Sequence, residues 1–229
     1  PARLFVQPTD RAQLCRAVAL CKAQGVRYYL LGNGSNILFA DEGYNGAVLD
    51  VSSMQDAVEV HGTQLTAGAG VRLSTLCKTA LEHGLTGLEF AYGIPGTVGG
   101  AVYMNAGAYG GEMKNVLTTV QYLTSEGEVK ESAASELDLR YRHSIFEENG
   151  GCILSAQFAL TQGEPEAIRA KMDELMAKRL DKQPLDKPSA GSTFKRPVGA
   201  FAAALIDQCG LRGYRHGGAA VSEKHCGFV

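Results

Sequence analysis

The sequence has no long apolar run, no strong net charge and no paired cysteines, and each absence narrows the possible classes of protein. No stretch of 18 apolar residues occurs, which excludes a membrane-spanning helix. The 22 Lys and Arg residues nearly balance the 24 Asp and Glu residues, so a broad nucleic-acid-binding surface is not expected. Charged residues make up 20% of the chain and hydrophobic residues 45%, which indicates a folded core rather than disorder.

Six cysteines occur at positions 15, 21, 77, 152, 209 and 226, and no two of them form a C-x-x-C pair. The five histidines are scattered as well, so no metal site is expected. Reduced core thiols and the lack of a visible secretory signal together predict a cytoplasmic protein. Because the chain starts at Pro1 and stops inside an apolar run at Val229, we expect it to be trimmed at both ends.

Glycine is the residue in excess, with 28 among 229 residues and nine of these between positions 84 and 111. Such an excess indicates either many tight turns or backbone that lies against a ligand. Many short strands with few helices predict an α+β fold rather than regular βαβ repeats. Helices are expected at 10–24, 74–84, 165–180 and 200–209, and strands at 4–6, 26–31, 47–51, 57–60, 64–67, 118–123, 152–160 and around 129. A Pro-, Gly- and Ser-rich segment at 183–199 marks the best domain boundary.

The first candidate site is Gly32-Asn33-Gly34-Ser35-Asn36, which directly follows the strand predicted to be buried at 26–31. Small polar residues and glycines after a strand expose successive N–H groups, which can form an anion-binding concavity. The segment lacks the third glycine and the following helix of a dinucleotide-binding motif, and it lacks the lysine of a P-loop. A tight turn with polar caps explains the same residues, so both interpretations stay open.

The second candidate site is Gly93-Ile94-Pro95-Gly96-Thr97-Val98-Gly99-Gly100, continued by Asn105-Ala106-Gly107. Almost every side chain between 93 and 111 is small, which leaves the backbone bare over a long path. This arrangement suits a large planar or diphosphate ligand contacted by main-chain N–H donors. A packed glycine-rich crossover is the alternative.

Two polar segments complete the candidates. In Tyr141-Arg142-His143-Ser144, the arginine could clamp a carboxylate with two parallel hydrogen bonds, although an arginine beside a tyrosine is more often an ordinary surface residue. Residues 178–196 carry six basic residues against two acidic ones, which suits a phosphate-bearing substrate around Gly191-Ser192. Ser192 lacks the G-x-S-x-G context of an acyl-transfer nucleophile, but a polarised hydroxyl could donate a proton there.

Taken in order along the chain, these four segments resemble the UDP-N-acetylenolpyruvoylglucosamine reductase family of flavin enzymes, and in particular its type II members. The resemblance covers essentially the whole chain. It implies the FAD-binding fold of the vanillyl-alcohol-oxidase (PCMH) type, an α+β fold with two subdomains, followed by the start of an α+β substrate-binding domain. The implied subdomains are residues 1–50 and 51–183, and the implied substrate-binding domain is 184–229, with the first and the last incomplete.

The resemblance also implies a reaction. FAD, bound noncovalently and reduced by NADPH, would deliver hydride to UDP-N-acetylglucosamine enolpyruvate and form UDP-N-acetylmuramate for peptidoglycan. We expect a monomer without a nucleic-acid or membrane partner. The implied FAD contacts are Gly32, Asn33, Gly34, Ser35, Asn36, Gly93, Ile94, Pro95, Gly96, Thr97, Gly99, Gly100, Asn105 and Gly107.

The implied catalytic residues are Arg142 and Ser192. Hydride addition builds negative charge on the carboxylate side of the substrate, where a fixed arginine lowers the barrier. Ser192 matches the family's proton donor to the adjacent carbon. The flavin itself carries the electrons, and the protein orients the flavin and the substrate and polarises the reacting groups. The implied substrate contacts are Tyr141, Lys182, Lys195 and Arg196, with Lys182 and Arg196 near the UDP moiety.

Two alternatives remain beside the reductase. The family has a catalytic glutamate near its C-terminus that no residue of this chain matches, so a non-catalytic fragment that binds FAD or a UDP-sugar is one alternative. An FAD oxidase of the same fold is the other. Such oxidases often tether the flavin through a His or Cys near the first phosphate loop, and Gly32–Asn36 contains neither, which favours noncovalent FAD.

Overall fold

The computed structural model describes residues 1–54 and 57–229, which form two compact units. The first unit contains residues 1–34 and 39–173, and the second contains residues 35–38 and 174–229. Helices and strands occur side by side throughout the chain, so the predicted α+β class is confirmed. None of the helices in the described ranges combines the length and the apolar character that crossing a bilayer requires.

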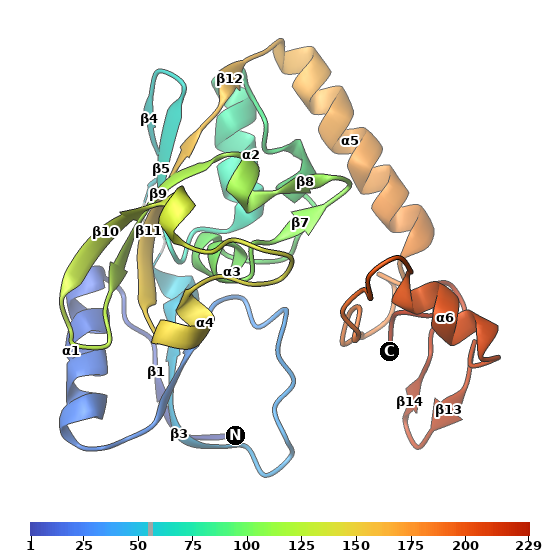
Figure 1. The fold of residues 1–229 in the computed structure, drawn as a ribbon, viewed down its shortest axis with the longest axis horizontal. Coiled ribbons are helices and arrows are strands. Elements are labelled where there is room, and N and C mark those ends of the chain that lie inside the picture. Colours follow the sequence, from blue (N-terminus) through green and yellow to red (C-terminus); the bar gives the residue numbers. More distant parts are fainter. Residues whose placement is uncertain (55–56) are drawn as a thin grey trace. The chain divides into compact units, whose positions relative to one another are not determined.

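A three-stranded parallel sheet, with strand order β1-β3-β2, opens the first unit (Figure 1). Its strands are β1 (Ala2–Val6), β2 (Tyr28–Leu31) and β3 (Tyr44–Asp50). Residues 28–31 are half-buried or exposed, so the prediction of a buried strand there is wrong. The reason is that β2 lies at an edge of the sheet, where it has one neighbouring strand instead of two.

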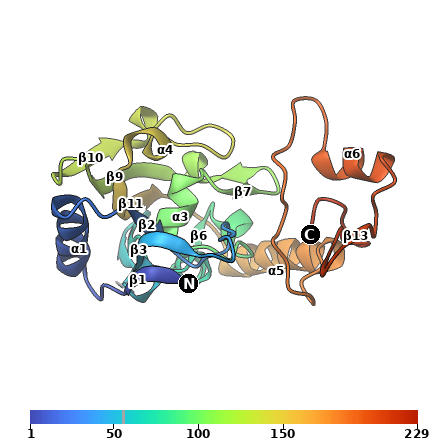
Figure 2. The ribbon, with the colours of Figure 1, turned by 90° about the horizontal axis from the view of Figure 1, so that it is seen from below.

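Helix α1 (Arg11–Ala23) flanks this sheet, as Figure 2 shows. The Asp10 carboxylate begins the helix by accepting a hydrogen bond from the Gln13 N–H at 2.8 Å. Gly25 follows the helix with a φ of +61°, which glycine adopts without strain. The apolar face of α1 packs into one core with residues of β3, β9 and β11 and of the 3-10 turn that follows β3. The residues of this core are Leu14, Val18, Cys21, Ala47, Leu49, Val51, Met54, Leu123, Cys152 and Leu154.

A five-stranded antiparallel sheet forms the rest of the first unit's framework, with strand order β10-β9-β11-β5-β4. Its central strand carries alternating buried residues, Leu154, Ala156 and Phe158, which is the pattern of a sheet with one face in the core. The strands are β4 (Glu59–His61), β5 (Gln64–Gly68), β9 (Leu117–Leu123), β10 (Val129–Ala133) and β11 (Cys152–Ala159).

Helices α2 (Leu73–Glu82) and α3 (Val98–Tyr103) belong to the same unit, and α3 packs against β5 and β11. No helix was predicted within the glycine-dense segment, because glycine disfavours helix by about 1 kcal/mol per residue relative to alanine. Here Thr97 caps the helix through its Oγ1, which accepts a hydrogen bond from the Gly100 N–H at 3.4 Å. Backbone hydrogen bonds from Val98 to Val71 and from Gly99 to Ala69 supply the rest of the explanation.

Several short elements complete the first unit. Strand β6 (Leu85–Thr86) pairs with β12 (Thr161–Gln162), and β7 (Gly107–Ala108) pairs with β8 (Gly111–Glu112). Helix α4 (Phe146–Asn149) is one turn long, and 3-10 turns occur at Val51–Ser53, Glu89–Ala91, Met113–Asn115 and Ala134–Glu136.

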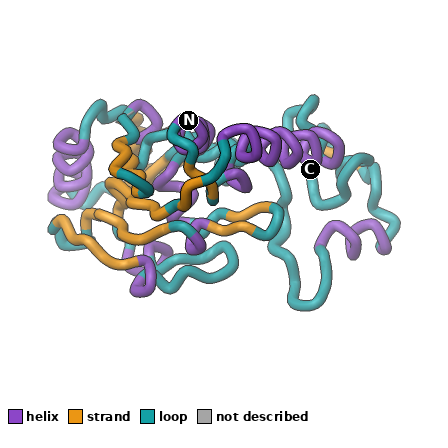
Figure 3. Tube along the Cα trace, turned by 90° about the horizontal axis from the view of Figure 1, so that it is seen from above, coloured by secondary structure: helices purple, strands orange, loops and turns teal. Residues whose placement is uncertain are grey.

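Helix α5 (Pro165–Lys182) begins in the first unit and ends in the second. The second unit also holds α6 (Ala202–Gln208), β13 (Arg215–His216) and β14 (Ala219–Ala220), and most of its remaining chain is loop (Figure 3). The loop at 189–193 is tied to the last residues of the chain, because Ala190 N–H donates to Val229 O at 2.8 Å. The other predicted helices and strands are present, with ends shifted by up to three residues.

Candidate functional site

The first two candidate segments meet where β2 ends. The Asn33 side-chain amide donates a hydrogen bond to the Pro95 carbonyl at 2.8 Å. Gly32 approaches Thr97 so closely that a Cβ atom at residue 32 would lie 2.6 Å from the Thr97 Oγ1. Since real Cβ atoms do not tolerate such a distance, glycine is required at position 32 by the contact between the two segments. The structure therefore brings the predicted cofactor residues near 32–33 and 95–97 together.

The backbone of residues 33–36 is available to a ligand. In the described part of the chain, none of the four N–H groups of residues 33–36 donates a hydrogen bond to a protein acceptor. These residues are exposed, and Gly34 has a φ of +66° with only Leu31 near its open side, at 3.9 Å. Successive unpaired N–H groups beside a positive-φ glycine suit the oxygens of a diphosphate. This loop therefore fits the phosphate part of a dinucleotide cofactor.

The backbone N–H groups at the start of α3, unlike those of residues 33–36, donate to protein acceptors. Val98 N–H donates to Val71 O at 2.8 Å and Gly99 N–H to Ala69 O at 2.9 Å, while Gly100 N–H is taken by Thr97. The expectation of ligand-facing N–H donors is therefore wrong for residues 98–100, because the carbonyls of Ala69 and Val71, which lie between β5 and α2, and the Thr97 cap already accept these hydrogen bonds.

The glycines of the second segment fall into two groups. Gly99 and Gly107 are tightly packed, since a Cβ would lie 2.8 Å from the Ala69 Cβ in the first case and 2.6 Å from the Gly111 carbonyl oxygen in the second. Gly96 and Gly100 are open instead, with no atom nearer than 3.6 Å to such a Cβ. The glycine excess thus has two origins, packing within the protein and backbone left bare. Gly93 and Ile94 lie half-buried beside this bare stretch.

Arg142 lies on a tight turn that reaches this second segment. Arg140 and His143 close the turn with two reciprocal backbone hydrogen bonds of 3.2 Å, which leaves Tyr141 and Arg142 at its tip. The Arg142 guanidinium donates to the Gly107 carbonyl at 3.0 Å and lies 5.2 Å from the centre of the Tyr141 ring. The structure therefore joins the predicted catalytic arginine to one of the predicted cofactor residues.

Asn105 and Glu112 support this turn through hydrogen bonds. Asn105 is fully buried, and its side chain donates to Glu112 Oε2 and to Arg140 O, each at 3.0 Å, and accepts from the Lys114 N–H. Its direct contact with FAD stays a prediction, because the structure gives its amide a positioning role. Ser144 is buried too, and its hydroxyl donates to the Tyr103 carbonyl at 2.6 Å.

Sequence reasoning missed Glu112. Its carboxylate pairs with the Lys114 ammonium at 2.9 Å. This hydrogen bond, together with the one from Asn105 and the charges of Lys114 and Arg142, lowers the pKa of Glu112 below its ordinary value. The available signal was an acidic residue directly after Gly110-Gly111 with a lysine two positions later.

The remaining predicted residues lie in the second unit. Ser192 is exposed, and it is placed by the positive φ of Gly191 (+77°) and by an antiparallel bridge to Phe228. The Arg196 guanidinium lies 5.2 Å from the centre of the Phe201 ring. Lys182 is the last residue of α5, and Lys195 lies exposed in the loop that follows Ser192. Basic residues and the hydroxyl thus share one solvent-facing segment.

Residues 2–133 match the family described as "FAD binding domain", so the protein is an FAD-binding flavoprotein. Residues 183–229 match the family described as "UDP-N-acetylenolpyruvoylglucosamine reductase, C-terminal domain". A reductase of that name from Clostridium novyi is 47% identical over 229 residues, which is all of this chain and 74% of the relative. The chain belongs to the UDP-N-acetylenolpyruvoylglucosamine reductase family.

Other relatives agree with this assignment. The reductase of Latilactobacillus sakei is 47% identical over 100% of this chain and 75% of its own length. The crystal structure of the Thermus caldophilus reductase superimposes with a TM-score of 0.83 at 37% identity, covering 98% of this chain and 79% of that one. The predicted family, FAD-binding fold and FAD cofactor are thereby confirmed, and the protein is an oxidoreductase.

Proposed function

We propose that this protein reduces UDP-N-acetylglucosamine enolpyruvate to UDP-N-acetylmuramate, with NADPH as the source of hydride. The observation that carries the proposal is the contact between Arg142 and Gly107, which places a guanidinium beside the segment proposed for FAD. The substrate named for the relatives carries a carboxylate next to the double bond that is reduced, and a guanidinium is a natural partner for that group.

The residues proposed to hold FAD are those of the loop 32–36 and of the open stretch 93–100, with Asn105 and Gly107 beside them. Their support is the set of unpaired N–H groups at 33–36 and the bare backbone at Gly96 and Gly100. FAD, when bound, supplies the hydride acceptor and donor that amino-acid side chains lack. The protein binds and orients it, and the contacts of Gly32 and Asn33 keep the two segments in register.

Arg142 is proposed to stabilise the negative charge that develops on the carboxylate side of the substrate when the double bond accepts hydride. A guanidinium held by a main-chain carbonyl is already oriented, so little reorganisation is needed when the charge appears. Ser192 is proposed to supply the proton to the neighbouring carbon from its hydroxyl. Its exposed position on the loop at 189–193 leaves that hydroxyl accessible.

Substrate recognition is proposed to involve Tyr141, Lys182, Lys195 and Arg196. The three basic residues would pair with the diphosphate of the UDP moiety. We further propose that residues 1–50 and 51–183 are the two FAD-binding subdomains and 184–229 part of the substrate-binding domain. The protein is proposed to act as a cytoplasmic monomer without nucleic-acid or membrane partners.

The experiment that tests the proposed function follows NADPH consumption by the FAD-loaded protein. Consumption that requires the enolpyruvyl substrate supports the reductase, and Arg142→Ala should lose this turnover while retaining FAD. Rapid reoxidation of the reduced flavin by dioxygen, with release of hydrogen peroxide, would instead support an oxidase of the same fold. A yellow protein that never consumes NADPH would support a non-catalytic binding fragment.

A further inference from the structure

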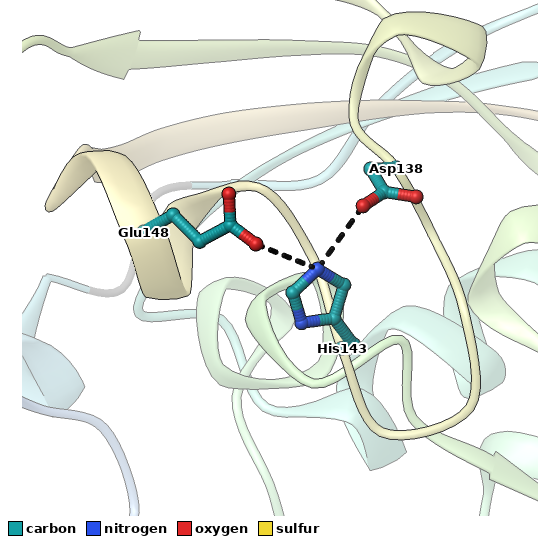
Figure 4. A group of neighbouring side chains, drawn as sticks. All are labelled: Asp138, His143 and Glu148. Atoms are coloured by element: carbon teal, nitrogen blue, oxygen red, sulfur yellow. Dashed lines mark hydrogen bonds and ion pairs between the residues drawn. The ribbon is translucent and has the colours of Figure 1, made fainter.

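A group of charged side chains surrounds His143, the residue that follows Arg142. Its Nδ1 lies 3.0 Å from Glu147 Oε2, and its Nε2 lies 3.2 Å from Asp138 Oδ2 and 3.7 Å from Glu148 Oε1. Figure 4 shows the Asp138 and Glu148 carboxylates approaching the same ring nitrogen of His143 from two directions. The His143 side chain is 15% exposed, much less than its acidic neighbours Asp138 and Glu148. The ring is therefore enclosed by groups that bind it.

The group resembles a metal site, because atoms of Asp138, His143 and Glu148 lie within 4.8 Å of one another. The positive charge at this group comes from a side chain of the protein, Arg140. The Arg140 guanidinium lies 2.6 Å from Asp138 Oδ2 and 2.8 Å from His143 Nε2. Since the guanidinium is permanently charged and donates hydrogen bonds only, its single positive charge offsets part of the negative charge of Asp138, Glu147 and Glu148. The arrangement therefore indicates a structural clamp rather than a metal centre.

The clamp acts on the turn that carries Arg142. Arg142 has a φ of +54° and Asp138 a φ of +46°, and both values lie in the left-handed region that side-chain-bearing residues rarely adopt. Such conformations persist where surrounding contacts over-determine them. His143 closes the turn through its backbone hydrogen bonds to Arg140, and its ring connects the turn to α4 through Glu147 and to Asp138.

We propose that His143 is a positioning residue that fixes the turn and thereby holds the Arg142 guanidinium beside Gly107. The inference rests on the proposed role of Arg142 in the reaction. Among the described residues, the hydrogen bonds and ion pairs of the His143 ring go to Asp138, Arg140, Glu147 and Glu148, so its effect on Arg142 passes through the backbone of the turn. Displacing a catalytic group by about 1 Å can slow a reaction roughly 100-fold, so loss of the clamp should be visible in the rate.

The test measures two half-reactions separately in the FAD-loaded protein by rapid mixing. In His143→Ala, reduction of the flavin by NADPH should keep its rate, whereas reoxidation by the enolpyruvyl substrate should slow roughly 10- to 100-fold. His143→Asn should recover most of the rate, because the asparagine amide can still donate toward Glu147. His61→Ala, which changes an exposed histidine of strand β4 far along the chain, is the matched control and should behave as the unchanged protein.

A double-mutant comparison separates positioning from a general loss of stability. Adding His143→Ala to Arg142→Ala should slow reoxidation no further, because the clamp then has no guanidinium to place. Independent, multiplicative losses would overturn the proposal, and so would unchanged reoxidation in His143→Ala. If His143→Ala fails to retain FAD, Glu147→Gln provides the same test, since it weakens the clamp while preserving shape; normal reoxidation in that variant overturns the proposal. Normal turnover of Arg142→Ala alone would instead refute the proposed function of that arginine.

Discussion

Gly99 and Gly100 are neighbours in α3 that should respond in opposite ways to replacement by alanine. A Cβ at position 99 would lie 2.8 Å from the Ala69 Cβ and 3.2 Å from the Ala69 carbonyl oxygen, and Gly99 and Ala69 are both buried. A Cβ at position 100 would meet only the Thr97 Oγ1, at 3.6 Å, and that position is exposed. The first glycine is therefore explained by packing inside the protein, and the second is free to face a ligand.

The expected magnitudes follow from these distances. Nonbonded carbon atoms prefer about 3.5–4.0 Å, so Gly99→Ala must push α3 away from Ala69, the residue that follows β5, by roughly 0.7–1.2 Å. Overpacking of this kind lowers the free energy of unfolding by about 1–3 kcal/mol, which corresponds to about 2–12 °C in Tm for a chain of this size. Gly100→Ala should raise the free energy of unfolding by up to about 1 kcal/mol, because alanine favours helix over glycine.

Two assays separate the contributions. Thermal unfolding of the FAD-free proteins reports packing, and titration with FAD reports the cofactor surface. Gly100→Ala should weaken FAD binding roughly 5- to 150-fold if its methyl group intrudes by the equivalent of about 1–3 kcal/mol. If Gly99→Ala proves as stable as Gly100→Ala, the packing explanation of Gly99 is refuted. Undiminished FAD affinity in Gly100→Ala would remove that residue from the proposed cofactor site.

Three further predictions concern the reaction, the support of the arginine turn and the substrate. Ser192→Ala should preserve flavin reduction by NADPH and slow reoxidation by substrate about 10²–10⁴-fold in rapid-mixing experiments; equal slowing of both steps would contradict the proton-donor role. Glu112→Gln should lower Tm near neutral pH, because the paired carboxylate has a lowered pKa. A depressed folded-state pKa contributes stability above the ordinary value of 4.5, and this is lost as pH falls through the folded pKa. The Tm difference should therefore vanish in melts below that range, and a constant difference would contradict the assignment. Lys195→Ala should raise KM for the UDP-sugar with kcat unchanged, as for a contact made equally in ground and transition states; an unchanged KM would contradict the contact.

Local signals in the sequence were sufficient for the elements whose causes are local. The cap at Asp10 and the stop at Gly25 delimit α1 to within a residue or two, and the strand predicted at 152–160 matches β11 to within one residue. Helix α3 could not be predicted in this way, since its stability depends on Ala69 and Val71, which lie almost thirty residues earlier in the chain. Propensity scales describe neighbours along the sequence and contain no information on such contacts.

In the candidate site, too, the sequence could identify residues but could not predict their geometry. The family's motif identifies Arg142 as a candidate catalytic residue. The backbone conformation of Arg142, however, depends on residues that lie outside the motif. Left-handed backbone at Arg142 and Asp138 costs about 1–3 kcal/mol per residue. Hydrogen bonds that contribute about 0.5–1.5 kcal/mol each offset this cost, and two of them come from the fully buried Asn105 and Ser144. The turn therefore depends on distant supports to hold one half-buried guanidinium beside Gly107.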